Sequence, residues 1–180
     1  MEEKKIRSQR IYEGKVIQVR VDEVEIEKKK FLREVVEHPG GVAVLAMKED
    51  GLIPCVWQYR YGQKKEMLEL PAGKLERGEN PVAAIQRELQ EETGYQAENW
   101  IYLGEFIPTG AYLEEKIQMF YADNLTFVGQ CFDEDEQIKN SEYTLDELTE
   151  MILNQQIIDG KTIAMVLKVK FMIEKNLLKI

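Results

Sequence analysis

Hydrophobic and polar residues alternate along the first part of the chain. Residues 15–27 read KVIQVRVDEVEIE, and this period of two predicts strands with one buried face. Ile17, Val19 and Val21 share one face, whereas the apolar residues after Asp22 and Glu23 are even-numbered, so we expect a bulge or bend at that point. With a turn at residues 28–30 and a returning strand at 31–36, the pattern predicts an antiparallel β segment at the N-terminus.

Apolar runs recur through the rest of the chain. The run at residues 42–47 is apolar without interruption, which indicates a strand buried on both faces. Glycine and proline separate the runs in the way that turns do. Together the runs predict strands at 42–47, 53–59, 67–70, 100–106, 116–122 and 137–140.

Helix signals lie between these strands. Asn80 followed by Pro81 is a helix start, and Gly94 is typical of a helix end. Thr144 opens a capping box for a helix to about residue 154, and Asp159 can cap the last helix. That helix has an apolar stripe of Ile163, Val166, Leu167 and Ile173. Interspersed helices and strands with short connections predict an α+β fold, an α/β/α sandwich around a mixed sheet.

Composition narrows the class of protein. The 180 residues suit one domain with a small appendage. A net charge of −9 without a basic block argues against nucleic acid as a partner. Cys55 and Cys131 have no metal-ligand spacing, and the first ten residues lack the apolar core of a signal peptide. No apolar run approaches the length of a membrane span. We therefore expect a cytoplasmic protein with free thiols and no membrane partner.

Three carboxylates share one face of the helix that Asn80 opens. Glu88, Glu91 and Glu92 are spaced i, i+3 and i+4, where like charges repel and destabilise an isolated helix. Ile85 and Leu89 form the stripe that would dock this helix on a core. A solvated acidic face is the ordinary explanation. A bound divalent cation is the alternative, and hard oxygen ligands suit Mg²⁺ or Mn²⁺.

The spacing around these carboxylates favours the cation. The chain reads Gly73, five residues, Glu79, seven residues, Arg87-Glu88-Leu89, one residue, Glu91-Glu92, one residue and Gly94. This stretch resembles the Nudix box at every position except the last, where Tyr95 replaces the usual aliphatic residue. The resemblance implies a Nudix-type sandwich in which the box helix packs on the sheet. It also implies hydrolysis of a diphosphate.

Motifs outside the box extend the resemblance over nearly the whole chain. They are similar to those of bacterial ADP-ribose pyrophosphatases, which cleave ADP-ribose to AMP and ribose 5-phosphate with Mg²⁺. The matching segments are residues 33–40 (REVVEHPG), 58–60 (QYR), 69–73 (ELPAG), 134–138 (EDEQI) and 159–162 (DGKT).

One loop departs from that subfamily. Its Ser-Pro-Gly motif and substrate-contacting glutamate are replaced by residues 108–116, PTGAYLEEK, in which Glu115 aligns with the glutamate. Another nucleotide sugar such as GDP-mannose therefore stays open as the substrate. A non-catalytic nucleotide-binding module would lose box glutamates, and none is lost here. An enzyme for oxidised nucleoside triphosphates is disfavoured by the N-terminal extension.

The resemblance also assigns metal ligands and a base. Glu88 and Glu92 are the primary ligands and belong to the catalytic group, and the carbonyl of Ala72 adds a backbone oxygen. Glu91 is a further ligand or a hydrogen-bonding neighbour of one. The acidic loop 133–136 supplies the general base, for which we choose Glu134, and a further metal contact, Glu136. A solvated acidic loop is the alternative for these last two.

Other residues are expected to bind substrate or to support the box. Arg60 is a candidate phosphate clamp or an ordinary surface arginine, and Glu115 a candidate substrate contact. Arg87 is expected to form a structural salt bridge, often with Glu79, rather than to bind phosphate. Gly73 and Gly94 are structural. His38, the only histidine, is expected to be structural rather than an acid–base group.

The N-terminal β segment is expected to serve assembly. An isolated hairpin is marginally stable, so it must pack against something. The resemblance implies a homodimer in which this segment is exchanged or shared near the substrate. We therefore divide the chain into residues 1–38, a β segment for dimerisation, and 39–180, the Nudix hydrolase domain.

Overall fold

The computed structural model describes residues 2–76, 78–130 and 138–179. Its strands are β1 (Lys4–Glu13), β2 (Gln18–Ile26), β3 (Lys29–Glu37), β4 (Gly41–Ala46), β5 (Leu52–Arg60), β6 (Lys65–Glu69), β7 (Ala72–Lys74), β8 (Tyr95–Phe106), β9 (Ile117–Phe127) and β10 (Ile138–Thr144), and its helices are α1 (Pro81–Thr93), α2 (Leu145–Leu153) and α3 (Gly160–Glu174).

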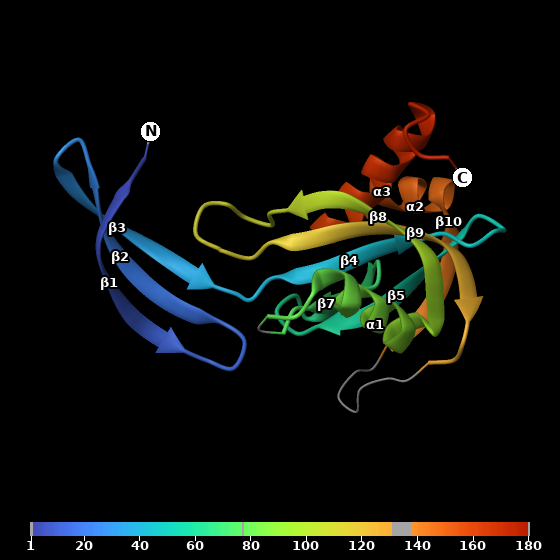
Figure 1. Ribbon diagram of the computed structural model, residues 1–180, viewed down its shortest axis with the longest axis horizontal. Coiled ribbons are helices and arrows are strands. Elements are labelled where there is room, and N and C mark those ends of the chain that lie inside the picture. The colour runs from blue at the N-terminus through green and yellow to red at the C-terminus, as the bar shows by residue number, and fades with distance from the viewer. Residues whose placement is uncertain (1, 77, 131–137, 180) are drawn as a thin grey trace.

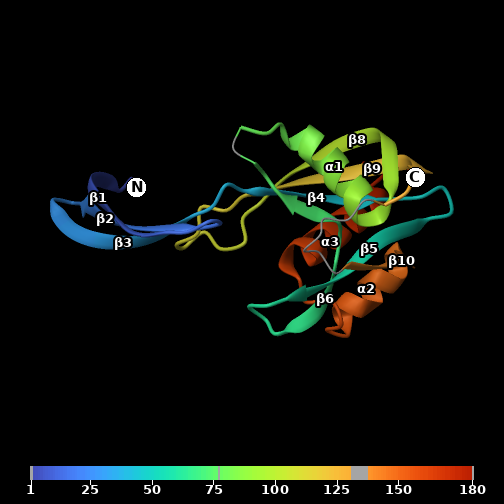
Figure 2. The ribbon, with the colours of Figure 1, turned by 90° about the horizontal axis from the view of Figure 1, so that it is seen from below.

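The described strands form three sheets. Strands β1, β2 and β3 make an antiparallel sheet that stands apart from the body (Figure 1). The body holds a mixed sheet in the order β7-β4-β9-β8, in which β4 and β9 are parallel, and an antiparallel sheet in the order β10-β5-β6. Figure 2 shows the N-terminal sheet extending away from this body on one side. This arrangement confirms the predicted α+β fold with a mixed sheet and an antiparallel N-terminal segment.

Strand β4 is buried on both faces, as its apolar run predicts. Its even-numbered residues, such as Val42 and Val44, pack with Ile85 and Leu89 of α1. Its odd-numbered residues Ala43 and Leu45, with Met47 just beyond the strand, join a second core with residues of α2 and α3. Because adjacent strand residues point to opposite faces, one strand separates two helical layers, and the α/β/α sandwich follows.

Local signals set the ends of α1. The side chain of Asn80 accepts hydrogen bonds from the backbone N–H of Val82 at 2.9 Å and Ala83 at 3.3 Å. Gly94 adopts a left-handed conformation with φ 79° and closes the helix, which glycine does at little cost. Tyr95, the unusual box residue, donates from its hydroxyl to Glu142 at 2.9 Å. The caps of α2 and α3 are also where the sequence predicts them, at Thr144 and Asp159. None of the described helices is long and apolar enough to cross a membrane.

Two expectations about the sequence pattern are wrong. Strand β2 pairs with β3 without interruption from Gln18 to Ile26, so no bulge occurs at Asp22 and Glu23. The irregular positions lie instead in β1, a strand that the pattern did not predict. In α3 the buried apolar residues are Met165, Val166 and Val169, so the stripe does not run through Leu167.

A loop of the body joins the N-terminal sheet to the domain. The backbone N–H of Val36 in β3 donates to the carbonyl of Tyr112 at 2.7 Å, and the N–H of Glu114 donates to the carbonyl of Val36 at 2.9 Å. The Glu114 carboxylate also pairs with Arg20 of β2 at 2.5 Å. The loop between β8 and β9, which contains Glu115, is therefore fixed to the sheet.

Candidate active site

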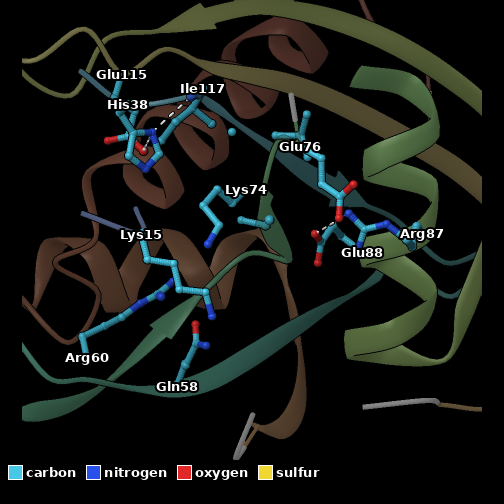
Figure 3. Close-up of a pocket in the computed structure, with 15 residues that line it drawn as sticks. Lys15, His38, Gln58, Arg60, Lys74, Glu76, Arg87, Glu88, Glu115 and Ile117 are labelled. Atoms are coloured by element: carbon cyan, nitrogen blue, oxygen red, sulfur yellow. Dashed lines mark hydrogen bonds and ion pairs between the residues drawn. The ribbon is translucent and has the colours of Figure 1, made fainter. Parts of the chain in front are cut away.

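A cleft of about 660 Å³ opens between the body and the hairpin that joins β1 to β2. Figure 3 shows Glu76, Arg87 and Glu88 on one side of it, Lys15, Gln58 and Arg60 on the other, Lys74 between them, and His38, Glu115 and Ile117 at one end. The middle of the box helix and the three cations Lys15, Arg60 and Lys74 thus face the same space.

Gly73 brings β7 against the box helix. A Cβ atom at Gly73 would lie 1.9 Å from the carboxylate carbon and from one carboxylate oxygen of Glu88, far inside van der Waals contact. Glu88 is 9% exposed. A side chain at this position would therefore displace the Glu88 carboxylate, which lies directly against β7.

Glu92 meets the same strand one turn further along α1. Its carboxylate accepts a hydrogen bond from the backbone N–H of Ala72 at 3.0 Å, and the residue is 2% exposed. Its backbone carbonyl accepts from the side chains of Gln130 at 3.2 Å and Asn140 at 2.9 Å. Two carboxylates of α1 are therefore held at the Ala72-Gly73 backbone.

Arg87 is surrounded by carboxylates. Its guanidinium lies 2.7 Å from Glu91, 2.9 Å from Glu88 and 3.4 Å from Glu79. Burial would lower the pKa of Arg87, but the charges of Glu88 and Glu91 outweigh that effect and hold the pKa above its ordinary value. Arg87 thus reduces the repulsion between neighbouring glutamates and ties Glu79 to the helix.

The donors at this place are suited to a hard divalent cation. Glu88 and Glu92 offer carboxylate oxygens beside the backbone of Ala72, and such oxygens are what Mg²⁺ prefers. Among the described residues, no group of three or more His, Cys, Asp or Glu side chains is arranged to hold a metal ion. Glu134 and Glu136, the predicted base and the predicted further ligand, lie outside the described residues.

Glu115 and His38 lie together at one end of the cleft. The Nδ1 atom of His38 accepts from the backbone N–H of Gly40 at 3.1 Å and lies 3.5 Å from the Glu115 carboxylate. Because that nitrogen already accepts a hydrogen bond, it does not donate to Glu115. His38 thus shapes the turn before β4, and Glu115 faces the cleft from the loop that is fixed to β3.

Arg60 ends β5 and is held by a buried carboxylate. Its Nε and one terminal nitrogen each donate to Glu69 of β6 at 2.6 Å. Glu69 also pairs with Lys161 at the start of α3. Arg60 lines the cleft described above and also a second cleft, again of about 660 Å³, that lies beside Glu69 and Lys161.

Some residues of the cleft were not predicted. Lys15 belongs to the β1–β2 hairpin, and Lys74 and Glu76 follow the box glycine. The sequence pattern placed Lys15 at the start of a strand, and nothing in the local sequence indicates that this hairpin reaches a site formed by residues 38–117. Lys74 and Glu76 lie within the box, close to Gly73 in the sequence. That position could have predicted that they line the cleft.

Comparisons with known proteins show what this chain resembles. A model of the NUDIX domain matches residues 37–165. The chain is 40% identical over 165 residues to a methanol dehydrogenase activator of Bacillus methanolicus, covering 90% of this chain and 89% of that protein. It is 38% identical over 165 residues, with the same coverage, to an ADP-ribose pyrophosphatase of Bacillus subtilis strain 168. A crystal structure of an ADP compounds hydrolase has the same fold, with a TM-score of 0.85 over 98% of this chain and 96% of that chain at 17% identity.

Proposed function

Because this chain belongs to the NUDIX domain family, we propose that it hydrolyses the diphosphate bond of ADP-ribose and releases AMP and ribose 5-phosphate. The observation that carries the proposal is the pair of carboxylates, Glu88 and Glu92, held at the Ala72-Gly73 backbone beside the cleft. The similarity to an ADP-ribose pyrophosphatase over most of both chains supports this substrate.

Magnesium is the proposed cofactor, with manganese as a possible substitute. Glu88, Glu92 and the carbonyl of Ala72 would hold it, with Glu91 and Glu136 as further contacts. A divalent ion at such a site neutralises charge on the diphosphate and activates water. The pairing of Glu91 with Arg87 at 2.7 Å favours a supporting role for Glu91.

The remaining roles belong to residues around the cleft. Arg60 would bind the diphosphate, because a guanidinium donates to phosphate oxygens in a fork. Glu115 would contact the sugar, since its carboxylate accepts hydrogen bonds from hydroxyl groups. Glu134 would take the proton from the attacking water. We further propose a homodimer formed through the N-terminal sheet, residues 1–38, as the unit that works.

Two alternative functions each have one observation in their favour. The altered loop at residues 108–116 favours another nucleotide sugar such as GDP-mannose. The relative named for activation of methanol dehydrogenase favours a protein that acts on a second enzyme. Both box ligands, Glu88 and Glu92, are present here, which supports hydrolysis in either case.

The test is product analysis with purified protein and Mg²⁺. ADP-ribose, ADP-glucose, NAD and GDP-mannose are each incubated, and the products are separated by chromatography. We expect AMP and ribose 5-phosphate to form fastest from ADP-ribose. Faster cleavage of GDP-mannose would keep the mechanism and change the substrate. No turnover of any compound would contradict the proposed hydrolysis.

A further inference from the structure

Glu69 is a buried charge that the proposed chemistry does not use. It ends β6 and is 1% exposed, and a buried carboxylate is costly unless it is paired and hydrogen-bonded. Burial would raise the pKa of Glu69, but Arg60 and Lys161 outweigh it and hold the pKa below its ordinary value. Glu69 is therefore an anion whose charge depends on these two cations.

The two motifs that flank the box, ELPAG and DGKT, meet in this ion pair. Lys161, 8% exposed, contacts Glu69 and lies 3.0 Å from the carboxylate of Asp159. Asp159 in turn accepts from the backbone N–H of Thr162 at 2.9 Å and so caps α3. The hydroxyl of Thr162 accepts from the backbone N–H of Leu70 at 3.0 Å. The Glu69 carboxylate is thus fixed by the start of a helix.

This fixed carboxylate determines how Arg60 is oriented. A guanidinium is planar and has five N–H donors in a rigid fork. Glu69 engages the Nε edge, through Nε and one terminal nitrogen, so the other terminal nitrogen points away from the buried side. The Arg60 side chain is 40% exposed against 2% for Glu69. Figure 3 shows Arg60 extending into the same cleft as Lys15 and Gln58.

Arg60 also stands where the two clefts meet. Both clefts are lined by Arg60, Glu115 and Ile117. A substrate made of two sugar-bearing halves joined by a diphosphate has its charge in the middle and its halves on either side. A cation shared by two adjoining clefts matches that distribution of charge.

We propose that Glu69 is a positioning residue, which holds the guanidinium of Arg60 at the junction of the two clefts so that its free edge binds the diphosphate of the substrate. This inference rests on the proposed function, because it takes a nucleoside diphosphate sugar as the ligand. Lys161 anchors Glu69 through the carboxylate oxygen that also accepts from a terminal nitrogen of Arg60. The anion acts only through Arg60 and does not touch the substrate.

The test is a double-mutant cycle in which the affinity for ADP-ribose is measured for each variant. Glu69→Gln, Arg60→Gln and the double variant are compared with the wild type by calorimetric titration with ADP-ribose in EDTA, where no metal-dependent turnover occurs. We expect Arg60→Gln and Glu69→Gln each to weaken binding about tenfold, as the loss of a charge-assisted hydrogen bond does. The double variant should bind no more weakly than Arg60→Gln alone. With Mg²⁺ present, KM should rise far more than kcat falls.

Two further variants separate positioning from stability. Glu66→Gln on the same strand removes an exposed pair with Lys139, and its affinity for ADP-ribose should match that of the wild type. Glu69→Asp keeps the negative charge near both cations but shortens the side chain, which disturbs the two-point contact with Arg60. It should fold even where Glu69→Gln does not, and still bind more weakly.

Four outcomes would go against the inference or its premise. Equal weakening by Glu69→Gln with and without Arg60, or a lower Tm at unchanged affinity, would overturn it. A wild type that binds ADP-ribose without cleaving it would contradict the proposed function, and the cycle would still decide the role of Glu69. A wild type that does neither would overturn both.

Discussion

At the level of single residues, the site depends on contacts that only certain side chains allow. At Gly73 the absence of a side chain leaves room for the Glu88 carboxylate, which occupies the space that a Cβ atom would need. Arg87 is required because three glutamates surround it within 3.4 Å. The carboxylates of the box helix are thus placed by one residue that lacks a side chain and another that supplies the opposing charge.

Replacement of Gly73 by alanine should push β7 and the Glu88 side chain of α1 apart. The added Cβ would lie 1.9 Å from the Glu88 carboxylate, so β7 or Glu88 must move. A displacement of about 1 Å at a reacting centre can cost roughly 100-fold, and we expect a loss of kcat/KM on that scale. Gly51→Ala is the control, because its site is open but has a φ of 81°; it should lower Tm and leave kcat/KM unchanged.

Replacement of Glu92 by glutamine should remove activity and keep the fold. The amide oxygen can still accept from the N–H of Ala72, which now bonds the carboxylate at 3.0 Å, but a neutral amide is a poor ligand for a hard cation. We expect kcat to fall at least about 100-fold, as when a charge-stabilising group is lost, with Tm close to that of the wild type. A large drop in Tm would show that Glu92 is structural.

The Glu69 ion pair should give stability a defined dependence on pH. The folded pKa of Glu69 lies below its unfolded value of 4.5, so its contribution is fully present above pH 4.5 and is lost as pH falls through the folded pKa. The difference in unfolding free energy between wild type and Glu69→Gln, measured with urea, should be constant near neutrality and shrink in acid. A difference unchanged across the acid range would contradict this.

At the level of elements, prediction from the sequence succeeded where the signal is local. The caps at Asn80, Thr144 and Asp159 and the apolar run of β4 identify their elements without tertiary information. Strand β1 was missed because all ten of its residues are exposed and only pairing with β2 makes it a strand. The bulge was wrongly expected because β2 lies in the middle of a sheet with no single buried face, so a change of phase has no structural consequence.

The cap of the box helix offers a test at this scale. Asn80→Ala leaves two backbone N–H groups without the acceptor that they have now, which should lower the unfolding free energy by about 1 kcal/mol. Asn80→Asp retains the acceptor and adds negative charge at the positive end of the helix, so it should be at least as stable as the wild type. Urea unfolding at neutral pH measures both, and equal stability of all three proteins would exclude a capping role.

At the level of the whole molecule, the site is assembled from distant parts. Arg60 and Lys161 are brought together across half of the chain, and Lys15 reaches the cleft from the separate N-terminal sheet. These contacts depend on packing between elements, so no local pattern could predict them. The local pattern also could not show which residues of that sheet are left uncovered. The exposed apolar residues are Ile6, Ile11, Tyr12, Val16, Ile17, Phe31 and Leu32.

This apolar surface predicts the state of assembly. We expect light scattering to give twice the 21.0 kDa of one chain, because an exposed patch of this kind marks an interface. Leu32→Glu, at a residue 64% exposed on β3, should shift the mass toward the monomer. Leu177→Glu, at a leucine that is 72% exposed near the C-terminus, is the matched control. A monomeric wild type would remove the sheet as a dimerisation element.

The backbone hydrogen bonds between Val36 and the loop at Tyr112 and Glu114 have a thermodynamic consequence. They join the sheet that would form the dimer to the loop that carries Glu115 into the cleft. Association of subunits and binding in the cleft would therefore both act on this loop. Coupling between two equilibria is reciprocal. If dimerisation raises the affinity for substrate by some factor, bound substrate must raise the affinity between subunits by the same factor.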